Sequence, residues 1–403
     1  MSAAATTSAT APEAVSLIAP PPLALYVHMP WCVRKCPYCD FNSHQLKSAA
    51  PSETYIDVLI RDFETELPLI GVRTIESVFF GGGTPSLFMP ESFDRLLRAV
   101  RSRARLATDA EITLEANPGT IERGAFAGYR DAGINRVSLG AQTFSGPALT
   151  RLGRIHSADD TLRAVEELRR AGIENFNLDL MYALPDQTVA AALADVDMAC
   201  SLQPAHLSHY QLTLEPGTVF HSRPPPLPDD EAAWAMQNEC QSLLAARGYE
   251  QYEVSAYATA GRRCRHNLTY WGFGDYLGIG AGAHGKLTLR APDRILRTAK
   301  PKQPREYQER LAAAADPIRD PIGDRQFIAA DQLPFEFMLN ALRLNEGFAV
   351  ADFRARTGLD PAALAGVLSE AESRHLLEPT AQGWRPSETG RRFLNDLLLR
   401  FLP

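Results

Sequence analysis

The sequence predicts an α/β protein in which a parallel sheet is followed by a smaller, mainly helical module. Six segments with strand composition are each followed by a turn and a stretch with apolar residues at helical spacing. Three of the six cysteines fall within eight residues, directly after the first of these strands. The 403 residues, 45 % of them hydrophobic, are enough to fill a large core and a smaller one.

The repeated order of strand and helix determines the type of sheet. Parallel neighbours need crossover connections, and helices of this length supply them, so six units in series imply a parallel sheet. Periodicity alone leaves two architectures open, a partial (β/α)6 barrel and a doubly wound sheet. The predicted strands are residues 23–29, 75–80, 111–116, 134–139, 176–182 and 207–212.

Local signals place several helices. Residues 52–67 and 91–100 carry apolar side chains at helical spacing. Ser157 opens another helix, with Asp160 at the acidic third position of a capping box. A long helix over 229–247 follows a proline-rich break and ends at Gly248.

Beyond this helix, the sequence gives weaker signals for secondary structure and domain boundaries. Residues 264–272 and 278–285 are glycine-rich and aromatic, which indicates loops that line a site. A polar stretch over 299–305 predicts a linker. From about residue 332, three short helices, a hairpin over 376–385 and a final helix over 387–399 predict a winged-helix-like module, with a helical lid as the alternative. The expected domains are a disordered tail 1–22, a core 23–255, a cofactor-site extension 256–300 and a C-terminal module 301–403.

Charge and composition exclude several classes of protein. The net charge is −7, and no basic run exceeds Arg262 and Arg263 with Arg265, so we expect no nucleic-acid partner. Residues 1–22 contain no Lys or Arg, unlike a secretory or transit peptide, and no apolar run reaches the about 20 residues of a membrane span. Cys200, Cys240 and Cys264 are scattered, as free thiols are in the reducing cytoplasm, where we expect the protein.

The three clustered cysteines, Cys32, Cys36 and Cys39, have a C-x3-C-x2-C spacing that indicates a metal site. They supply three thiolates from one loop, one fewer than a cubane cluster or a closed zinc site needs. In a 4Fe–4S cluster one iron would remain open to a small molecule with an amine and a carboxylate, such as S-adenosylmethionine. The alternatives are a zinc site completed by a distant side chain and a chance cluster of surface thiols.

The loop resembles the signature of the radical SAM family, which implies the partial (β/α)6 barrel, a 4Fe–4S cluster and S-adenosylmethionine. Residues 26–44 resemble the HemN/HemW group, and the HemW heme chaperones in particular. HemN-type coproporphyrinogen III oxidases carry a further cysteine two residues after the third cluster ligand. Here that position is Phe41, which speaks against porphyrinogen decarboxylation.

Candidate contacts to S-adenosylmethionine lie at the ends of the predicted strands. Gly82, Gly83 and Thr84 form a turn where the backbone can approach a ligand closely. A carboxylate such as Asp179 in an apolar strand is costly to bury without a partner, which favours a ligand contact. The resemblance implies the same role for the wider set Tyr26, Tyr38, Gly82, Gly83, Thr84, Glu115, Gln142, Arg154, Asp179, Thr213 and His284.

A second motif covers residues 266–271 and resembles the HNxxYW motif of HemW. The resemblance implies heme contacts from His266, Asn267, Tyr270 and Trp271. An imidazole, or the neighbouring Cys264, is a suitable heme ligand, whereas the alternative is a packed and hydrogen-bonded core histidine. The same two alternatives apply to His206, His209 and His221. Arg262 and Arg263 suit heme propionates or form a solvated charge run.

The resemblance implies a heme chaperone rather than an enzyme of porphyrin metabolism. Its expected partners are heme, an electron donor for the cluster, and heme-accepting proteins such as respiratory cytochromes, membrane-associated ones included. The sequence leaves the oligomeric state open, and a homodimer is one of the alternatives. Two other functions remain as alternatives: an oxygen-independent coproporphyrinogen III oxidase, and a radical SAM enzyme acting on another substrate.

Overall fold

The computed structural model of the protein describes residues 20–46, 53–120, 125–290, 294–313 and 322–403. Residues 1–19, which make up most of the expected tail, lie outside the described residues. Residues 20–22 are described, and Pro21 among them is buried. The backbone N–H of Asp275 donates to the carbonyl of Pro22 at 2.8 Å, so this end of the expected tail packs on the fold.

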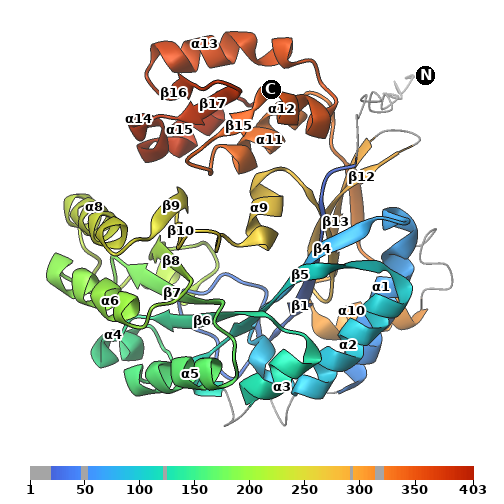
Figure 1. The fold of residues 1–403 in the computed structure, drawn as a ribbon, viewed down its shortest axis with the longest axis vertical. Helices are drawn as coiled ribbons and strands as arrows, with labels where there is room; N and C mark the ends of the chain where they lie inside the picture. The colour runs from blue at the N-terminus through green and yellow to red at the C-terminus, as the bar shows by residue number, and fades with distance from the viewer. Residues whose placement is uncertain (1–19, 47–52, 121–124, 291–293, 314–321) are drawn as a thin grey trace, which may run out of the picture.

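The six predicted strands are confirmed, and they lie side by side in chain order within one sheet. All five pairings among them are parallel, as the strand and helix order predicts. The sheet curves around its inner face, as Figure 1 shows. The six strands are β1 (Leu23–Met29), β4 (Thr74–Gly82), β5 (Arg105–Ala116), β6 (Arg136–Gln142), β7 (Phe176–Tyr182) and β8 (His206–Gln211).

The helices that connect these strands cover the outer face of the curved sheet (Figure 1). The predicted capping box of α5 is present, with Ser157 and Asp160 bonded reciprocally. Helix α8 begins after Asp229, whose carboxylate accepts from the N–H of Ala232, and Gly248 follows its end with a φ of 85°. The connecting helices are α1 (Glu53–Ile70), α2 (Pro90–Arg103), α3 (Ala125–Ala132), α4 (Gly146–Arg151), α5 (Ala158–Arg170) and α6 (Val189–Ser201). Two further helices, α7 (Val219–Ser222) and α8 (Asp230–Ala246), follow β8.

The sheet continues beyond both ends of the six-strand core. Strand β11 (Asp275–Ile279) pairs in parallel with β1, and β12 (His284–Leu289), β13 (Arg294–Ala299) and β14 (Asp324–Phe327) follow it in antiparallel order. At the other edge, β10 (Ala256–Ala258) pairs with β8, and β9 (Glu250–Glu253) pairs with β10. Residues 278–285, which we expected to form a loop, therefore include the end of β11 and the start of β12. The prediction failed because the glycines of this stretch hide the strand pattern.

Residues 264–272, also expected to form a loop, contain helix α9 (Arg265–Trp271). The N–H groups of Arg265 and His266 donate to the carboxylate of Glu111 on β5, at 3.1 and 3.0 Å. A seven-residue helix has little stability of its own. The cap comes from a residue more than 150 positions earlier, so no local signal marks this helix.

The predicted linker over 299–305 is also different in the structure. Lys300 is buried and forms ion pairs with Asp62 at 2.7 Å and Glu66 at 2.6 Å, both on α1. Helix α10 (Pro304–Ala313) follows directly. This polar stretch is part of the core because its lysine pairs with buried carboxylates. The composition of the stretch alone does not reveal these partners.

The C-terminal module has the predicted order of a winged helix. Its three short strands pair in the order β15-β17-β16. The final helix, expected to be continuous, is broken at Phe393, where φ is −111° and ψ is 43°. The elements are α11 (Leu333–Ala341), β15 (Phe348–Ala349), α12 (Val350–Thr357), α13 (Ala365–Ser373), β16 (Leu377–Pro379), β17 (Gly383–Pro386), α14 (Glu388–Arg392) and α15 (Leu394–Leu399).

This module packs against α9 and β9, near the amino ends of the barrel strands (Figure 1). The ring of Phe337 on α11 contacts Phe273, with ring centroids 5.6 Å apart. The guanidinium of Arg343 lies 4.5 Å from the ring centre of Trp271, the last residue of α9. The module therefore covers α9 and leaves the opposite end of the barrel, where the strands finish, uncovered.

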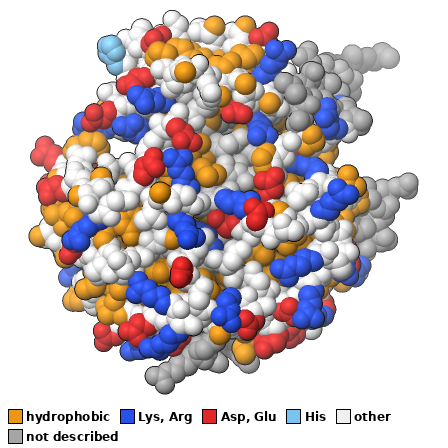
Figure 2. Space-filling model, viewed as in Figure 1, with side chains coloured by type: hydrophobic (Ala, Val, Ile, Leu, Met, Phe, Trp, Pro, Cys, Tyr) orange, Lys and Arg blue, Asp and Glu red, His pale blue; other side chains and the backbone are white. Residues whose placement is uncertain are grey.

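The surface carries mixed charge. On the face in Figure 2, Lys and Arg side chains alternate with Asp and Glu and form no large basic patch. Among the described helices, none has the length and apolar character required to cross a bilayer.

Candidate functional site

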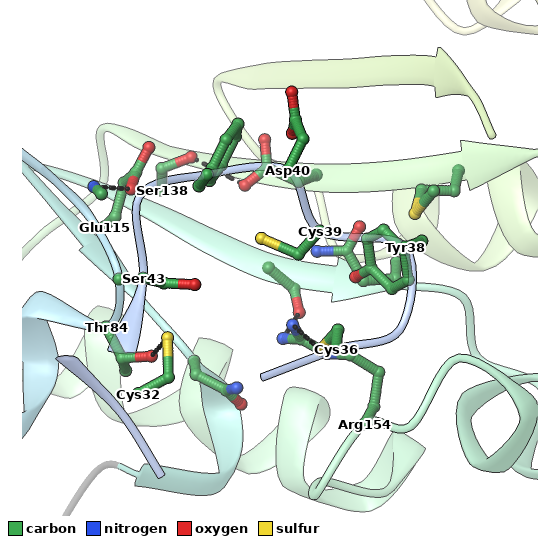
Figure 3. A pocket seen from close by; sticks show the side chains of 18 of the residues that line it. Cys32, Cys36, Tyr38, Cys39, Asp40, Ser43, Thr84, Glu115, Ser138 and Arg154 are labelled. Atoms are coloured by element: carbon green, nitrogen blue, oxygen red, sulfur yellow. Dashed lines mark hydrogen bonds between the residues drawn. The ribbon is translucent and has the colours of Figure 1, made fainter. Parts of the chain in front are cut away.

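The cysteine loop follows β1 and is closed by a short parallel pair, β2 (Trp31–Cys32) and β3 (His44–Gln45). Cys32, Cys36 and Cys39 are free thiols, each partly buried. They line a cavity of about 380 Å³ at the carboxyl ends of the barrel strands, together with residues from β4 to β8 (Figure 3). The sequence placed three thiols in one loop, and the fold places that loop over the barrel.

The thiols are held by neighbours from other elements. The hydroxyl of Thr84 donates to the sulfur of Cys32 at 3.4 Å, and the guanidinium of Arg154 donates to the sulfur of Cys36 at 3.8 Å (Figure 3). Burial raises the pKa of Cys32 and of Cys39, partly offset by hydrogen bonds from Thr84 and from the backbone of Phe41. Metal binding requires thiolates, so an iron cluster would release these protons.

The donor set suits an iron–sulfur cluster, since three thiols from one loop share a cavity with free volume beside them. In the part of the chain that the structure describes, no group of three His, Cys, Asp or Glu side chains is already gathered at metal-binding distance, these cysteines included. In a cubane cluster each thiolate holds a different iron, so the three sulfurs need not gather around a single ion.

The glycine turn after β4 approaches the loop too closely for any other residue. Gly82 has a φ of 110°, and a Cβ there would lie 2.4 Å from the ring of His28. A Cβ on Gly83 would lie 2.5 Å from the carbonyl oxygen of Trp31. The N–H of Gly83 donates to Met29, and these contacts clamp the turn onto the end of β1.

Two carboxylates face the cavity from neighbouring strands. Burial, together with the negative charge of Asp179, raises the pKa of Glu115 to about 7, although the N–H of Gly82 opposes the shift. Burial also raises the pKa of Asp179, which hydrogen bonds from Asn177, Ser208 and Ser138 counteract. Such a pair is poised to accept hydrogen bonds from an ammonium or hydroxyl group entering the cavity.

The sequence prediction missed two residues that orient cavity side chains. The hydroxyl of Tyr210 on β8 donates to the amide oxygen of Gln142 at 2.7 Å, and that of Ser138 on β6 donates to Asp179 at 3.0 Å. Gln142 itself has a left-handed φ of 67° at the end of its strand, a conformation common at binding sites. Each missed residue stands two positions before another residue that lines the cavity: Ser138 before Gly140, and Tyr210 before Leu212. Because alternate residues of a strand point to the same face, this spacing was the signal in the sequence that could have identified them.

Most of the predicted cofactor residues come together, and some do not. Those that line the cavity are Cys32, Cys36, Cys39, Tyr38, Gly82, Gly83, Thr84, Glu115, Gln142, Arg154, Asp179 and Thr213. Tyr26 does not line it but packs against Gly81 beside Glu115, with its hydroxyl 3.0 Å from Nδ1 of His28. His284 is exposed at the start of β12, outside the cavity lining.

The four motif residues His266, Asn267, Tyr270 and Trp271 lie on α9, at the other end of the barrel from the cysteines. His266 is 1 % exposed, and its two ring nitrogens lie 2.9 Å from the hydroxyl oxygens of Ser77 and Tyr270. Burial lowers the pKa of His266 to about 3, so the ring is neutral. In this arrangement both nitrogens are occupied, and neighbouring Cys264 is fully buried.

Comparison with known proteins agrees with the geometry. A model of the radical SAM superfamily matches residues 26–199, and a model of the HemN C-terminal domain matches residues 328–393. Among solved structures, coproporphyrinogen III oxidase HemN from Escherichia coli, a radical SAM enzyme, superimposes with a TM-score of 0.79 over 95 % of this chain and 90 % of that one. At 21 % identity this likeness concerns the fold.

Similarity in sequence is higher to proteins named heme chaperone HemW. The Escherichia coli K12 protein is 48 % identical over 95 % of this chain and 98 % of its own length. The Haemophilus influenzae protein is 46 % identical over the same shares of the two chains. The chain therefore belongs to the HemW family of radical SAM proteins.

Proposed function

We propose that the protein is a cytoplasmic heme chaperone, which binds heme and passes it to heme-accepting proteins. The observation that carries this proposal is the 48 % identity, over nearly the full length of both chains, to a relative named heme chaperone HemW. An electron donor, membrane-associated acceptors such as respiratory cytochromes and a homodimer belong to the same proposal. We also propose that the chain divides into four parts: a tail 1–22, a core 23–255, a cofactor-site extension 256–300 and a C-terminal module 301–403.

In this proposal Cys32, Cys36 and Cys39 hold a 4Fe–4S cluster, and the cavity beside them holds S-adenosylmethionine. When bound, the cluster supplies an electron that the sulfonium of S-adenosylmethionine can accept. The residues of the chain bind and orient: the glycine turn brings its backbone to the wall of the cavity, and Glu115 and Asp179 accept from amine and hydroxyl groups. The further contacts proposed are Tyr26, Tyr38, Gly82, Gly83, Thr84, Gln142, Arg154, Thr213 and His284.

The heme is assigned to the motif on α9, through His266, Asn267, Tyr270 and Trp271. Membership of the HemW family supports this assignment. In the conformation described here, however, His266 is not free to bind heme iron. Because Ser77 and Tyr270 occupy both nitrogens of His266, direct ligation of heme iron by this imidazole requires α9 to move away from β4. The C-terminal module packs on α9, so we expect heme loading to alter that contact.

Anaerobic titration with heme, followed by the heme absorbance band, tests this assignment. His209 is the control, because it is also buried but faces the helices outside the barrel, stacked on Tyr182. We expect wild type and His209→Ala to bind heme stably and His266→Ala to bind less. Equal loading of the His266→Ala protein would remove the heme site from α9. A wild-type protein that binds no heme would end the chaperone proposal.

A further inference from the structure

A continuous chain of buried hydrogen bonds links the cofactor cavity to α9 through the interior of the barrel. Its members are between 0 and 1 % exposed, apart from Asp179 at the cavity end. The contacts are Asp179 Oδ1 to Asn177 Nδ2 at 2.8 Å, Asn177 Oδ1 to His206 Nδ1 at 2.7 Å, His206 Nε2 to the hydroxyl of Tyr252 at 2.8 Å, and that hydroxyl to the N–H of Cys264 at 3.2 Å.

Strand register brings the first three members together. Asn177 and Asp179 are two residues apart on β7, so both side chains point into the barrel. His206 lies directly opposite Asn177 on β8. The order of the chain is therefore fixed by the sheet and does not depend on loop conformation.

The two ends of the chain determine the direction of every hydrogen bond. The amide oxygen of Asn177 can only accept, so Nδ1 of His206 carries the ring proton and donates to it. In a neutral ring Nε2 is then the acceptor, and the hydroxyl of Tyr252 donates to it while accepting from the backbone N–H of Cys264. A neutral ring is required, and burial, with the nearby charge of Arg136, lowers the pKa of His206 well below its usual value.

At the other end, the amide nitrogen of Asn177 donates to Asp179, whose second oxygen accepts from Ser138. Every donor in the chain thus points toward the cavity carboxylate. A buried carboxylate without such donors is costly, and it would protonate or turn aside. We infer that Asn177, His206 and Tyr252 are positioning residues for the S-adenosylmethionine site, holding Asp179 oriented into the cavity. This inference rests on the proposed function, because it takes S-adenosylmethionine as the ligand.

The test is the affinity of the reconstituted, full-length protein for S-adenosylmethionine, measured anaerobically by calorimetry. His206→Leu removes the shorter of the two hydrogen bonds that the amide oxygen of Asn177 accepts, and leaves only the one from Ser208. We expect roughly tenfold weaker binding, the effect of one buried hydrogen bond. His206→Asn keeps an N–H donor near the position of Nδ1 and should recover most of the affinity. His209→Leu is the matched control, since His209 lies on the same strand, is similarly buried and faces outward.

A pH profile separates positioning from a general loss of packing. The titratable and charged groups that interact with Asp179 from the other strands are Glu115, Arg136 and Tyr210, and they are unchanged in these variants. Loss of a donor raises the pKa of Asp179, so binding by the variant should begin to fail at a higher pH than binding by wild type as the solution is acidified. A defect in packing alone would weaken binding equally at every pH.

Tyr252→Phe provides a second test that keeps the ring and removes only the hydroxyl, in case His206→Leu fails to fold. We expect it to weaken binding and to shift the pH profile in the same direction. Wild-type affinity and pH profile in the folded variants, with full iron content, would overturn this inference and leave the proposed function standing. A wild-type protein that carries the cluster but does not bind S-adenosylmethionine would overturn both.

Discussion

The backbone N–H of Gly82 donates a hydrogen bond to the carboxylate of Glu115, 3.2 Å away on the neighbouring strand. This contact joins the glycine turn after β4 to the carboxyl end of β5, directly beneath the cysteine loop. It stabilises the ionised form of Glu115, but burial and the charge of Asp179 outweigh it. Both residues line the cavity, and each can be tested by its own substitution.

Glu115 should make the stability of the metal-free protein decrease with pH. Its folded-state pKa is about 7, against 4.5 for the ordinary side chain, so between these values the folded state binds more protons than the unfolded state. Stability from this group is therefore lost as pH rises from about 4.5 to about 7. Relative to wild type, Glu115→Gln should gain on the order of 2 kcal/mol across that range, measured by urea unfolding at several pH values. A difference that does not vary with pH would contradict the assigned pKa.

Gly82→Ala should destabilise the protein by at least about 2 kcal/mol, because alanine does not tolerate a φ of 110° and its Cβ would meet His28 at 2.4 Å. The control is Gly366→Ala in α13, where a Cβ has no heavy atom within 4 Å. We expect that control to be neutral or to stabilise by up to about 1 kcal/mol. Equal unfolding midpoints for the two variants would show that the glycine turn is not constrained as described.

Replacing Cys32, Cys36 or Cys39 by Ala should abolish the iron–sulfur absorbance of the anaerobically reconstituted protein. The three thiols are the cysteines that line the cavity, so no other can substitute. Cys200→Ala and Cys240→Ala serve as controls, because both are buried residues of the outer helices α6 and α8 and do not line the cavity. Iron analysis that finds a full cluster in any variant of the loop would refute the assigned ligands.

Lys300→Met should destabilise the protein by about 3–5 kcal/mol, because it removes the buried cation from Asp62 and leaves Glu66 with Arg325 alone. Lys302→Met is a matched control at an exposed position two residues later, with an expected change of less than about 0.5 kcal/mol. Chemical denaturation of the metal-free protein measures both. A small effect at Lys300 would mean that the segment directly after β13 is held to α1 by packing rather than by this ion pair.

Features with a local signal in the sequence could be predicted. The six core strands, the capping box at Ser157 and the order of the C-terminal helices and hairpin all depend on patterns within a few residues. Cavity residues such as Gln142 and Asp179 could be predicted because strand ends in a parallel sheet gather at one edge.

Features that depend on partners far along the chain could not be predicted. Helix α9 is capped by Glu111, β11 joins the sheet beside β1, and Lys300 is buried by carboxylates of α1. The inward pair Ser138 and Tyr210 was missed because each is chemically ordinary by itself. Their role appears only when strand register places them beside Asp179 and Gln142.

Transfer of heme is the measurement that tests the central proposal most directly. The anaerobically reconstituted protein is loaded with heme, separated from free heme and mixed with an apo-hemoprotein, and the spectrum of the acceptor is followed. A parallel sample with reductant and S-adenosylmethionine receives coproporphyrinogen III. Phe41, 57 % exposed at the cavity, offers no thiol, so we predict heme transfer and no protoporphyrinogen IX. Catalytic conversion of coproporphyrinogen III, or heme that never reaches the acceptor, would contradict the account.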